Sequence, residues 1–280
     1  MMIVSVNHFN IKQIAESGQC FRMNQEEGGR YSLVAFGRYL ELCQLEENVI
    51  ELGCTKEEYD EVWKDYFDIG YDYGRIVGEL MAGEDAFLKQ AAVYGSGIRI
   101  LRQEPFEMLI SFIISQNKNI PSIKHCIEWI CERYGDLRKD KSTGVLYHVF
   151  PSAKQLAMAE KGELRELKLG YRDNYILSAA KTVAEDRISL EKLKRTSHEE
   201  AVEELQKIHG VGKKVANCVS LYGLHHIEAF PVDVWIKRIL NDVYNNKFNA
   251  EHFKGYAGII QQYMFFYIRF LKGQVKTLKT

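Results

Sequence analysis

The spacing of apolar residues divides the chain into a strand-like beginning and a helical remainder. Over residues 3–54 the apolar runs are short and rich in β-branched and aromatic residues, a pattern typical of antiparallel strands. From Thr55 onward apolar residues recur at helical spacing, as they do on amphipathic helices. The pattern predicts an α+β fold, with a small antiparallel-sheet domain over residues 1–94 and a mainly α-helical body over residues 95–280.

Several residues mark the starts of helices in this body. Pro105 and Pro121 each stand before an apolar run, where the first position of a helix is expected, because proline needs no amide partner there. Further helices are expected from Ser152 and from Arg172. Ser197 opens a Ser-x-x-Glu capping box, which satisfies backbone amides at a helix start. The body is thus expected to consist of several separate helices.

A glycine-containing hairpin joins two of the expected helices at about residues 198–224. The first helix ends near His209, Gly210-Val-Gly212 forms the turn, and the second helix begins at about Lys213. The first amides of a helix have no partner within it and lie at the positive end of its dipole, so they favour an anion such as phosphate. The alternative is an ordinary helical hairpin whose glycines only allow close packing.

Charge is divided unevenly along the chain. The 37 basic and 38 acidic residues nearly cancel. However, residues 1–90 hold 8 basic and 17 acidic side chains (net −9), and residues 91–280 hold 29 and 21 (net +8). Such asymmetry indicates that the second part binds a polyanion. The alternative is two solvated surfaces of different charge.

Other classes of protein are excluded by composition. No apolar stretch approaches the roughly 20 residues that are needed to cross a bilayer. The N-terminus lacks the basic region and cleavage site of a signal peptide. The 6 cysteines include no Cys-x-x-Cys pair, which argues against a zinc site or a redox dithiol. We therefore expect an intracellular protein with reduced thiols and no membrane partner.

A lysine and an aspartate carry the candidate chemistry. Lys214, in the second hairpin helix, is followed 19 residues later by Asp233 in the sequence Pro-Val-Asp. Side chains at the starts of two helices can face the same cleft. Gly-Val-Gly-x-Lys followed by Pro-Val-Asp resembles the helix-hairpin-helix DNA glycosylase superfamily. The resemblance implies that Lys214 is the catalytic nucleophile and that Asp233 is its partner.

Further motifs narrow the resemblance to the 8-oxoguanine DNA glycosylases. They are SGQCFRM at 17–23, ILRQEPFEMLISFIISQNKNI at 100–120, LGYR at 169–172 and YAG at 256–258. Together they cover roughly residues 17–265 in the order that the family has. The resemblance implies a monomeric DNA N-glycosylase and AP lyase, in which two helical subdomains flank a DNA cleft. Such an enzyme removes 8-oxoguanine from double-stranded DNA through a lysine Schiff base.

The resemblance also assigns roles to single residues. Four would form the base pocket: Gly18 through its carbonyl, Cys218 and Phe265 on the two faces of the base, and Gln261 at its Watson–Crick edge. Others would contact DNA: Asn117 at the opposite base, Tyr171 as a wedge beside it, Arg172, and Gly210, Gly212 and Val215 through amides on a phosphate. No cofactor is expected, although three backbone carbonyls could hold a structural cation, as hairpins of this family often do: those of Gln206, Ile208 and Val211.

These residues also have ordinary structural explanations. Phe265 lies in an aromatic-rich helix, where such side chains usually form core, and Cys218 can be a small buried apolar residue. Asn117 can simply turn the chain, and Tyr171 can anchor a helix start. The alternative functions are a glycosylase for another damaged base and a non-catalytic helix-hairpin-helix DNA-binding protein. No iron-sulfur cluster is expected, because no cysteine follows Cys218.

The chain departs from the family at Ser122. Members that demand cytosine opposite the lesion generally have an arginine two residues after the isoleucine of the Asn-x-Asn-Ile turn, and Ser122 occupies that place here. A bidentate arginine contributes about 1–3 kcal/mol of base discrimination, which serine cannot supply. Lys124 is a flexible point charge and does not replace a planar fork. The resemblance therefore implies a relaxed preference for the opposite base.

Overall fold

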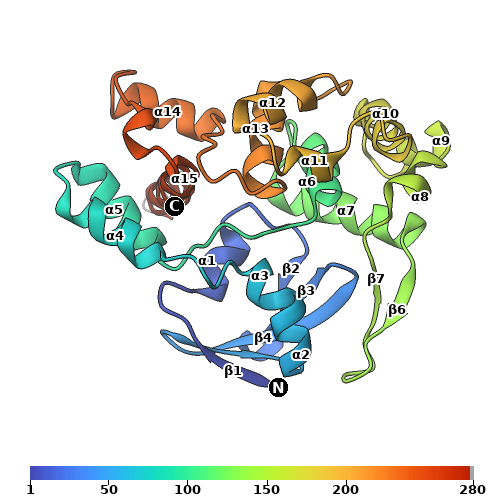
Figure 1. Ribbon diagram of the computed structural model, residues 1–280, viewed down its shortest axis with the longest axis horizontal. Coiled ribbons are helices and arrows are strands. Elements are labelled where there is room, and N and C mark those ends of the chain that lie inside the picture. The colour runs from blue at the N-terminus through green and yellow to red at the C-terminus, as the bar shows by residue number, and fades with distance from the viewer. Residues whose placement is uncertain (278–280) are drawn as a thin grey trace.

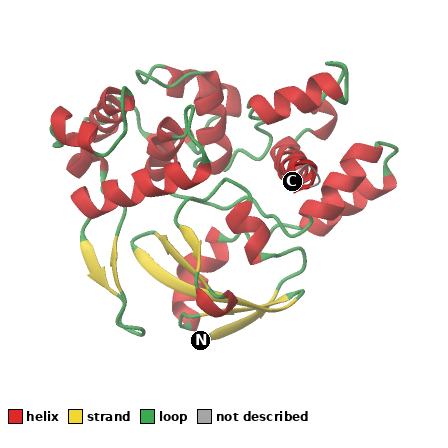
Figure 2. Cartoon of the chain, turned by 180° about the vertical axis from the view of Figure 1, so that it is seen from behind, coloured by secondary structure: helices red, strands yellow, loops and turns green. Residues whose placement is uncertain are grey.

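The structure is a computed structural model that describes residues 1–277. A sheet domain formed by the first part of the chain lies below a larger helical body, as Figure 1 shows from one side and Figure 2 from behind. The predicted α+β class is confirmed. Residues 278–280, which belong to the expected body over 95–280, lie outside the described residues.

The N-terminal sheet has five antiparallel strands in the order β1-β5-β4-β3-β2. Its strands are β1 Met2–Ser5, β2 Met23–Gln25, β3 Tyr31–Ala35, β4 Arg38–Glu46 and β5 Val49–Leu52. Alternate side chains point to one face of a strand, and Leu33, Leu40 and Leu52 are fully buried on it. They share a core with Trp63 and Phe67 of the helical segment that follows the sheet.

The expectation of strands over residues 3–54 is wrong at two places, one of them the short 3-10 helix η1 Glu27–Gly29 between β2 and β3. The helix α1 spans Ile11–Glu16, and the side chain of Asn10 caps it by accepting a hydrogen bond from the amide of Gln13 at 2.9 Å. A helix of six residues has fewer than two turns, so its apolar residues do not repeat often enough to reveal a period. The cap residue was its only local signal.

The helical part begins after the sheet and continues to the end of the described chain. Its N-terminal elements are α2 Lys56–Glu58, η2 Tyr59–Trp63, α3 Lys64–Tyr66, α4 Tyr73–Ala82 and α5 Ala86–Gly95. The central ones are α6 Pro105–Ile114, α7 Ile120–Tyr134, α8 Ala153–Ala157, α9 Lys161–Glu166, α10 Arg172–Ala184 and α11 Leu190–Leu193. The last are α12 His198–Gln206, α13 Lys213–Tyr222, α14 Val234–Asp242, η3 Ala250–Phe253 and α15 Ala257–Thr277. No described helix is both long and apolar enough to span a bilayer.

The predicted helix starts are confirmed, with one small shift. Pro105 stands at the first position of α6, and Ser197 forms the complete capping box of α12. The helix α7 begins at Ile120, because the side chain of Asn119 caps it and Pro121 follows inside the first turn. A short hairpin of β6 Leu137–Lys139 and β7 Leu146–His148 interrupts the helices and was not predicted. In Figure 1 this hairpin projects from the helical body beside the sheet domain.

Packing divides the molecule into two cores. One is centred on the sheet and includes residues of α1, η2 and α3, together with Leu101. The other runs through the helical body from Tyr73 onward, where α15 packs on α5 and α13 packs between α6 and α12. The predicted boundary between residues 1–94 and 95–280 stays a prediction. Figure 1 shows α4 and α5 beside α15, within the helical layer.

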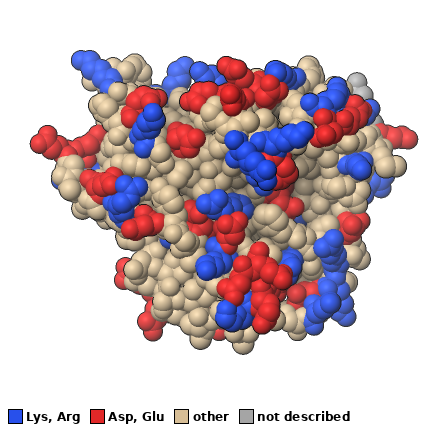
Figure 3. All heavy atoms as spheres, in the orientation of Figure 1, with Lys and Arg blue, Asp and Glu red and all other residues tan. Residues whose placement is uncertain are grey.

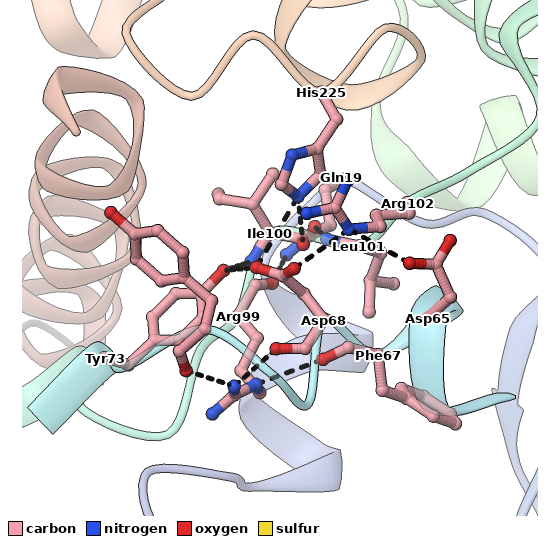
Figure 4. Close-up of polar contacts among 11 residues, drawn as sticks. Gln19, Asp65, Phe67, Asp68, Tyr73, Arg99, Ile100, Leu101, Arg102 and His225 are labelled. Carbon is pink, nitrogen blue, oxygen red and sulfur yellow. Dashed lines mark hydrogen bonds and ion pairs between the residues drawn. The ribbon is translucent and has the colours of Figure 1, made fainter. Parts of the chain in front are cut away.

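Arg99 links the two cores (Figure 4). Its guanidinium is 2% exposed and lies 4.2 Å from the ring centre of Tyr73. The same group donates hydrogen bonds to five backbone carbonyls, those of Asn7, His8, Phe67, Asp68 and Tyr71. A buried charge is tolerated when its donors are satisfied, so Arg99 fixes the chain between sheet and helices in one arrangement.

Gln19 continues this junction toward the helical body. Its side chain donates to the carbonyl of Arg99 and accepts from the amide of Leu101, both at 2.9 Å, as Figure 4 shows. It also donates to the hydroxyl of Ser17 at 3.0 Å. Gln19 is fully buried. The loop of Ser17 and Gly18 is therefore held from the side of the sheet domain, close to the helices.

Candidate active site

One cavity of about 870 Å³ brings together residues from five parts of the chain. The loop at Ser17, the turn between α6 and α7, the starts of α13 and α14, and the middle of α15 line it. Nine predicted site residues line this cavity: Gly18, Asn117, Gly212, Lys214, Val215, Cys218, Asp233, Gln261 and Phe265. The other six are not part of its lining: Tyr171, Arg172, Gln206, Ile208, Gly210 and Val211.

Lys214 and Asp233 enter the cavity from the first turns of neighbouring helices. The ammonium nitrogen of Lys214 lies 5.5 Å from the ring centre of Phe112, which forms part of the apolar wall. The carboxylate of Asp233 caps α14 by accepting from the amides of Trp235 and Ile236, both at 2.9 Å. Both side chains are half-buried. The cavity is thus lined by an amine and by a carboxylate that its own helix holds in place.

Cys218 and Tyr222 follow Lys214 at intervals of four residues, on one face of α13. Burial raises the pKa of the Cys218 thiol, although the nearby Lys214 opposes this effect. Cys218 therefore remains a neutral, polarisable wall residue. Tyr222 was not predicted as a site residue, although the same stripe on the helix points to it. Its ring stacks on Phe112 at 5.4 Å.

Gly18 lies close to the Phe265 ring in the wall of the cavity. Its φ of +79° is a conformation that favours glycine. A Cβ atom there would lie 3.3 Å from the Phe265 ring, so no side chain fits without a shift. The carbonyl of the preceding Ser17 accepts a hydrogen bond from Gln262 of α15. Helix α15 therefore fixes the loop as well as contributing Gln261 and Phe265 to the wall.

The two hairpin glycines have different surroundings. A Cβ on Gly210 would lie 2.2 Å from the Tyr175 ring, and the carbonyl of Gly210 accepts from Gln116 at 3.1 Å. A Cβ on Gly212 would meet nothing within 4 Å. Close packing therefore explains Gly210 but not Gly212, which borders the open cavity.

The start of α13 offers free backbone amides. Gly212 is its N-cap residue and provides no side-chain cap. The carbonyl of Gly212 accepts the amide of Ala216 at 3.0 Å, so the amides before Ala216 have no partner inside the helix. The amide of Val215 is among them. An anion at this end would meet donors and the positive end of the helix dipole.

The turn between α6 and α7 is supported by the start of α10. Asn117 has a φ of +52°, and its side-chain nitrogen Nδ2 donates to the hydroxyl of Tyr171 at 3.4 Å; Tyr171 is 49% exposed. Arg172 is buried, its guanidinium lies 4.5 Å from the Tyr171 ring centre, and it donates to the carbonyls of Leu169 and Gln116. Tyr171 is thus accessible to a ligand, whereas the buried Arg172 stabilises the turn through its hydrogen bond to Gln116.

The position that departs from the family pattern is also visible. The amide of Ser122 donates to the side chain of Asn119 at 2.9 Å, which places Ser122 in the first turn of α7. Lys124 points to the sheet domain, where its ammonium donates to the carbonyl of Met23 and to Asn24. Burial lowers the pKa of Lys124. The side chain of Lys124 is therefore held by the sheet domain and does not take the place of the missing arginine.

Of the three carbonyls expected to hold a cation, that of Gln206 ends α12 and those of Ile208 and Val211 lie in the hairpin turn. The carbonyl of Ile208 accepts the amide of Val211 at 3.0 Å, which leaves one of its lone pairs free. Within residues 1–277 no cluster of three or more His, Cys, Asp or Glu side chains is arranged for a metal. The cation at Gln206, Ile208 and Val211 stays a prediction.

Charge around the cavity is mainly positive. Its wall contains Lys118, Lys214, Lys237 and Arg269 but only one acidic side chain, Asp233. Figure 3 shows acidic side chains over α2 and η2 of the sheet domain, and others over the helical layer, where basic side chains lie beside them. The positive lining of the cavity, rather than the charge of the whole face, suits a polyanion.

Two protein families match successive parts of the chain. Residues 1–109 match the family described as 8-oxoguanine DNA glycosylase, N-terminal domain, and residues 110–254 match the HhH-GPD superfamily of base excision DNA repair proteins. An N-glycosylase/DNA lyase of Saccharomyces cerevisiae is 40% identical over 56% of this chain but only 45% of its own length. A probable N-glycosylase/DNA lyase of Methanothermobacter thermautotrophicus is 30% identical over 72% of each chain.

Two solved structures are similar over nearly their whole length. MBOgg1 in complex with a low-affinity DNA ligand has a TM-score of 0.90 and 39% identity, covering 96% of both chains. The 8-oxoguanine glycosylase/lyase of Clostridium acetobutylicum, in complex with double-stranded DNA containing cytosine opposite 8-oxoguanine, has a TM-score of 0.89 and 36% identity, covering 97% of this chain and 99% of that one. The chain therefore belongs to the 8-oxoguanine DNA glycosylase family within the HhH-GPD superfamily of base excision DNA repair proteins.

Proposed function

We propose that this protein is a bifunctional DNA glycosylase and AP lyase that removes 8-oxoguanine from duplex DNA through a Schiff base on Lys214. One observation carries the proposal. The amine of Lys214 and the fixed carboxylate of Asp233 share a cavity, and the free amides of α13 lie at its edge. A reactive amine, a counter-charge and a phosphate site are thus within reach of one flipped nucleotide.

DNA binding comes first. A phosphate is held by the amides at the start of α13, where Gly212 leaves room for its approach. The target base leaves the stack at a cost of a few kcal/mol, because its sugar cannot be attacked inside the duplex. Tyr171 inserts beside the vacated position, and Asn117 contacts the base left behind. The exposure of Tyr171 and its contact with Asn117 support these roles.

The chemistry then proceeds in two stages. The neutral amine of Lys214 attacks C1′, so that an N–C1′ bond forms while the bond to the base breaks and the base leaves with its electron pair and a proton. Opening of the sugar ring gives the Schiff base, and the carboxylate of Asp233 stabilises the positive charge that develops. Loss of a C2′ proton next expels the 3′ phosphate by β-elimination, which is the lyase step.

Lesion choice depends on the carbonyl of Gly18. Guanine has an acceptor at N7, whereas 8-oxoguanine has an N–H there, so only the lesion satisfies this carbonyl. An unmade hydrogen bond of this kind costs on the order of 1–3 kcal/mol. The base would lie between Cys218 and Phe265, both of which line the cavity.

Opposite-base preference is proposed to be relaxed, because Ser122 offers no planar fork and Lys124 is turned to the sheet. Single-turnover excision of 8-oxoguanine opposite each of the four bases is expected to give rates within roughly tenfold of one another. Ser122→Arg is expected to favour cytosine. A hundredfold wild-type preference for cytosine, unchanged in the variant, would show that another residue contacts that base.

Borohydride trapping tests the assignment of the nucleophile. Lys214→Gln is expected to bind lesion-containing duplex nearly as wild type does, since backbone amides hold the phosphate, but to lose base excision and covalent trapping. Lys213→Gln is the control, because Lys213 adjoins the motif but is exposed and does not line the cavity. Wild-type trapping by Lys214→Gln would refute the proposal. A protein that binds DNA but never traps would be a non-catalytic helix-hairpin-helix protein.

A further inference from the structure

We propose that a buried hydrogen-bond chain fixes the direction of the Gln261 amide and so selects a guanine-type base over an adenine-type base. The chain runs from the carbonyl of Ser17 through Gln262 and Tyr222 to Gln261. The inference rests on the proposed function, because it concerns which base that pocket accepts. It makes Tyr222 and Gln262 positioning residues.

The direction of the chain follows from counting protons. The carbonyl of Ser17 can only accept, so Gln262 must turn its NH2 group toward it. The side-chain oxygen of Gln262 then faces the hydroxyl of Tyr222 and accepts its proton. A tyrosine hydroxyl carries one proton only. Tyr222 therefore has no further proton to donate.

This fixes the remaining link. The terminal amide of Gln261 approaches the Tyr222 hydroxyl to 3.3 Å through its oxygen, which leaves two amide oxygens facing one proton. Rotation of the Gln261 amide by half a turn resolves the conflict, because its NH2 group then donates to the hydroxyl oxygen. The amide oxygen of Gln261 then points away from Tyr222. Gln261 lines the cavity, so this oxygen is available to the base.

Burial stabilises the hydrogen-bond chain of Gln262, Tyr222 and Gln261. Gln261, Gln262 and Tyr222 are 4%, 1% and 5% exposed, so bulk water does not replace the partners. An unsatisfied polar group in such a place is costly. The amide of Gln261 consequently has one favoured orientation before any base enters.

That orientation suits one class of base. The Watson–Crick edge of 8-oxoguanine presents N–H donors at N1 and N2, which an amide oxygen accepts. 8-Oxoadenine has an acceptor at N1 but shares the N7–H, so the carbonyl of Gly18 does not separate the two lesions. In this scheme Gly18 tests for oxidation and Gln261 tests for guanine. The hydrogen-bond chain that orients Gln261 begins at Ser17, the neighbour of Gly18, so the two selective residues belong to one network.

Tyr222→Phe removes the central hydroxyl and keeps the ring that stacks on Phe112. Single-turnover excision is measured for 8-oxoguanine and 8-oxoadenine in the same duplex with the same opposite base. We expect the wild type to favour 8-oxoguanine, and Tyr222→Phe to reduce the ratio of the two rates by about tenfold, as one misdirected hydrogen bond would. Gln262→Leu interrupts the next link and is expected to reduce the ratio in the same way.

Tyr263→Phe is a matched control on α15. Within the described chain, the Tyr263 hydroxyl is buried and has no hydrogen-bond partner, so its removal is expected to leave the ratio unchanged. A ratio within twofold of wild type in both Tyr222→Phe and Gln262→Leu overturns the inference, as does an equal loss in Tyr263→Phe. A wild type that does not excise 8-oxoguanine at all instead refutes the proposed function.

Discussion

Gly210 and Gly212 illustrate how two identical residues, two positions apart, serve different ends. Gly210 has a φ of +86° and meets the Tyr175 ring, whereas Gly212 has an ordinary φ of −86° and open space in front of it. The first glycine allows the hairpin to pack. The second keeps the entrance to the α13 amides clear. Sequence alone could not separate these roles, because the position of Tyr175 is a tertiary fact.

Alanine at each position is expected to separate stability from DNA binding. Gly210→Ala should lower the free energy of unfolding by about 1–3 kcal/mol, through strain and collision with Tyr175. Gly212→Ala should leave it nearly unchanged but weaken binding to lesion-containing duplex by roughly tenfold, because a methyl group meets the phosphate. Thermal melting and duplex titration measure the two effects. Equal melting of both variants would contradict this division.

At the scale of elements, the helix α14 is capped by the same carboxylate that the proposed chemistry uses. Asp233 accepts from the amides of Trp235 and Ile236, and asparagine can accept in the same way. Asp233→Asn should therefore melt close to wild type while excision falls by about a hundredfold or more, through loss of the charge. Asp233→Ala should in addition lose about 1 kcal/mol of stability. If Asp233→Asn excises the base as fast as the wild type does, the negative charge of Asp233 has no part in the mechanism.

The longer helices could be predicted from sequence because caps and apolar spacing agree, as at Ser197 and Pro105. The hairpin β6–β7 could not, since strands of three residues show no alternation. Lys214 and Asp233 came from a recognisable motif. Tyr222 could have been predicted, because it lies on the same helical stripe as Cys218. Gln262 was not predictable, because its partner Ser17 is remote in sequence and only the fold brings them together.

At the scale of the whole molecule, a buried acid lies where the sheet domain meets the helices. Glu107 of α6 is 6% exposed, and burial raises its pKa to about 8 although Arg22 opposes the shift. Arg22 comes from the sheet domain and donates to Glu128 of α7. The folded protein therefore retains a proton that the unfolded chain releases near its ordinary pKa of 4.5.

This difference gives stability a defined dependence on pH. Between about pH 4.5 and 8 the folded state binds more protons than the unfolded state, so the Glu107 contribution to stability falls as the pH rises. Glu107→Gln should melt higher than wild type at pH 8, by about 1 kcal/mol or more in stability, and the gain should vanish near pH 4.5. Melting curves at several pH values measure this. The exposed Glu166→Gln is the control, and a gain independent of pH would contradict the prediction.

The contacts of α15 with the N-terminal loop have a consequence for the growing chain. Gln262 contacts Ser17 across 245 residues, and Arg269 contacts Glu16 across 253. A ribosome releases the loop long before its partner helix. The nascent protein thus has Lys214 and the phosphate-binding hairpin before it has Gln261 and Phe265. In the proposed mechanism, a chain that has been synthesised only as far as α14 has the nucleophile but lacks the α15 side chains that test a base, so selective repair begins only after α15 has been made.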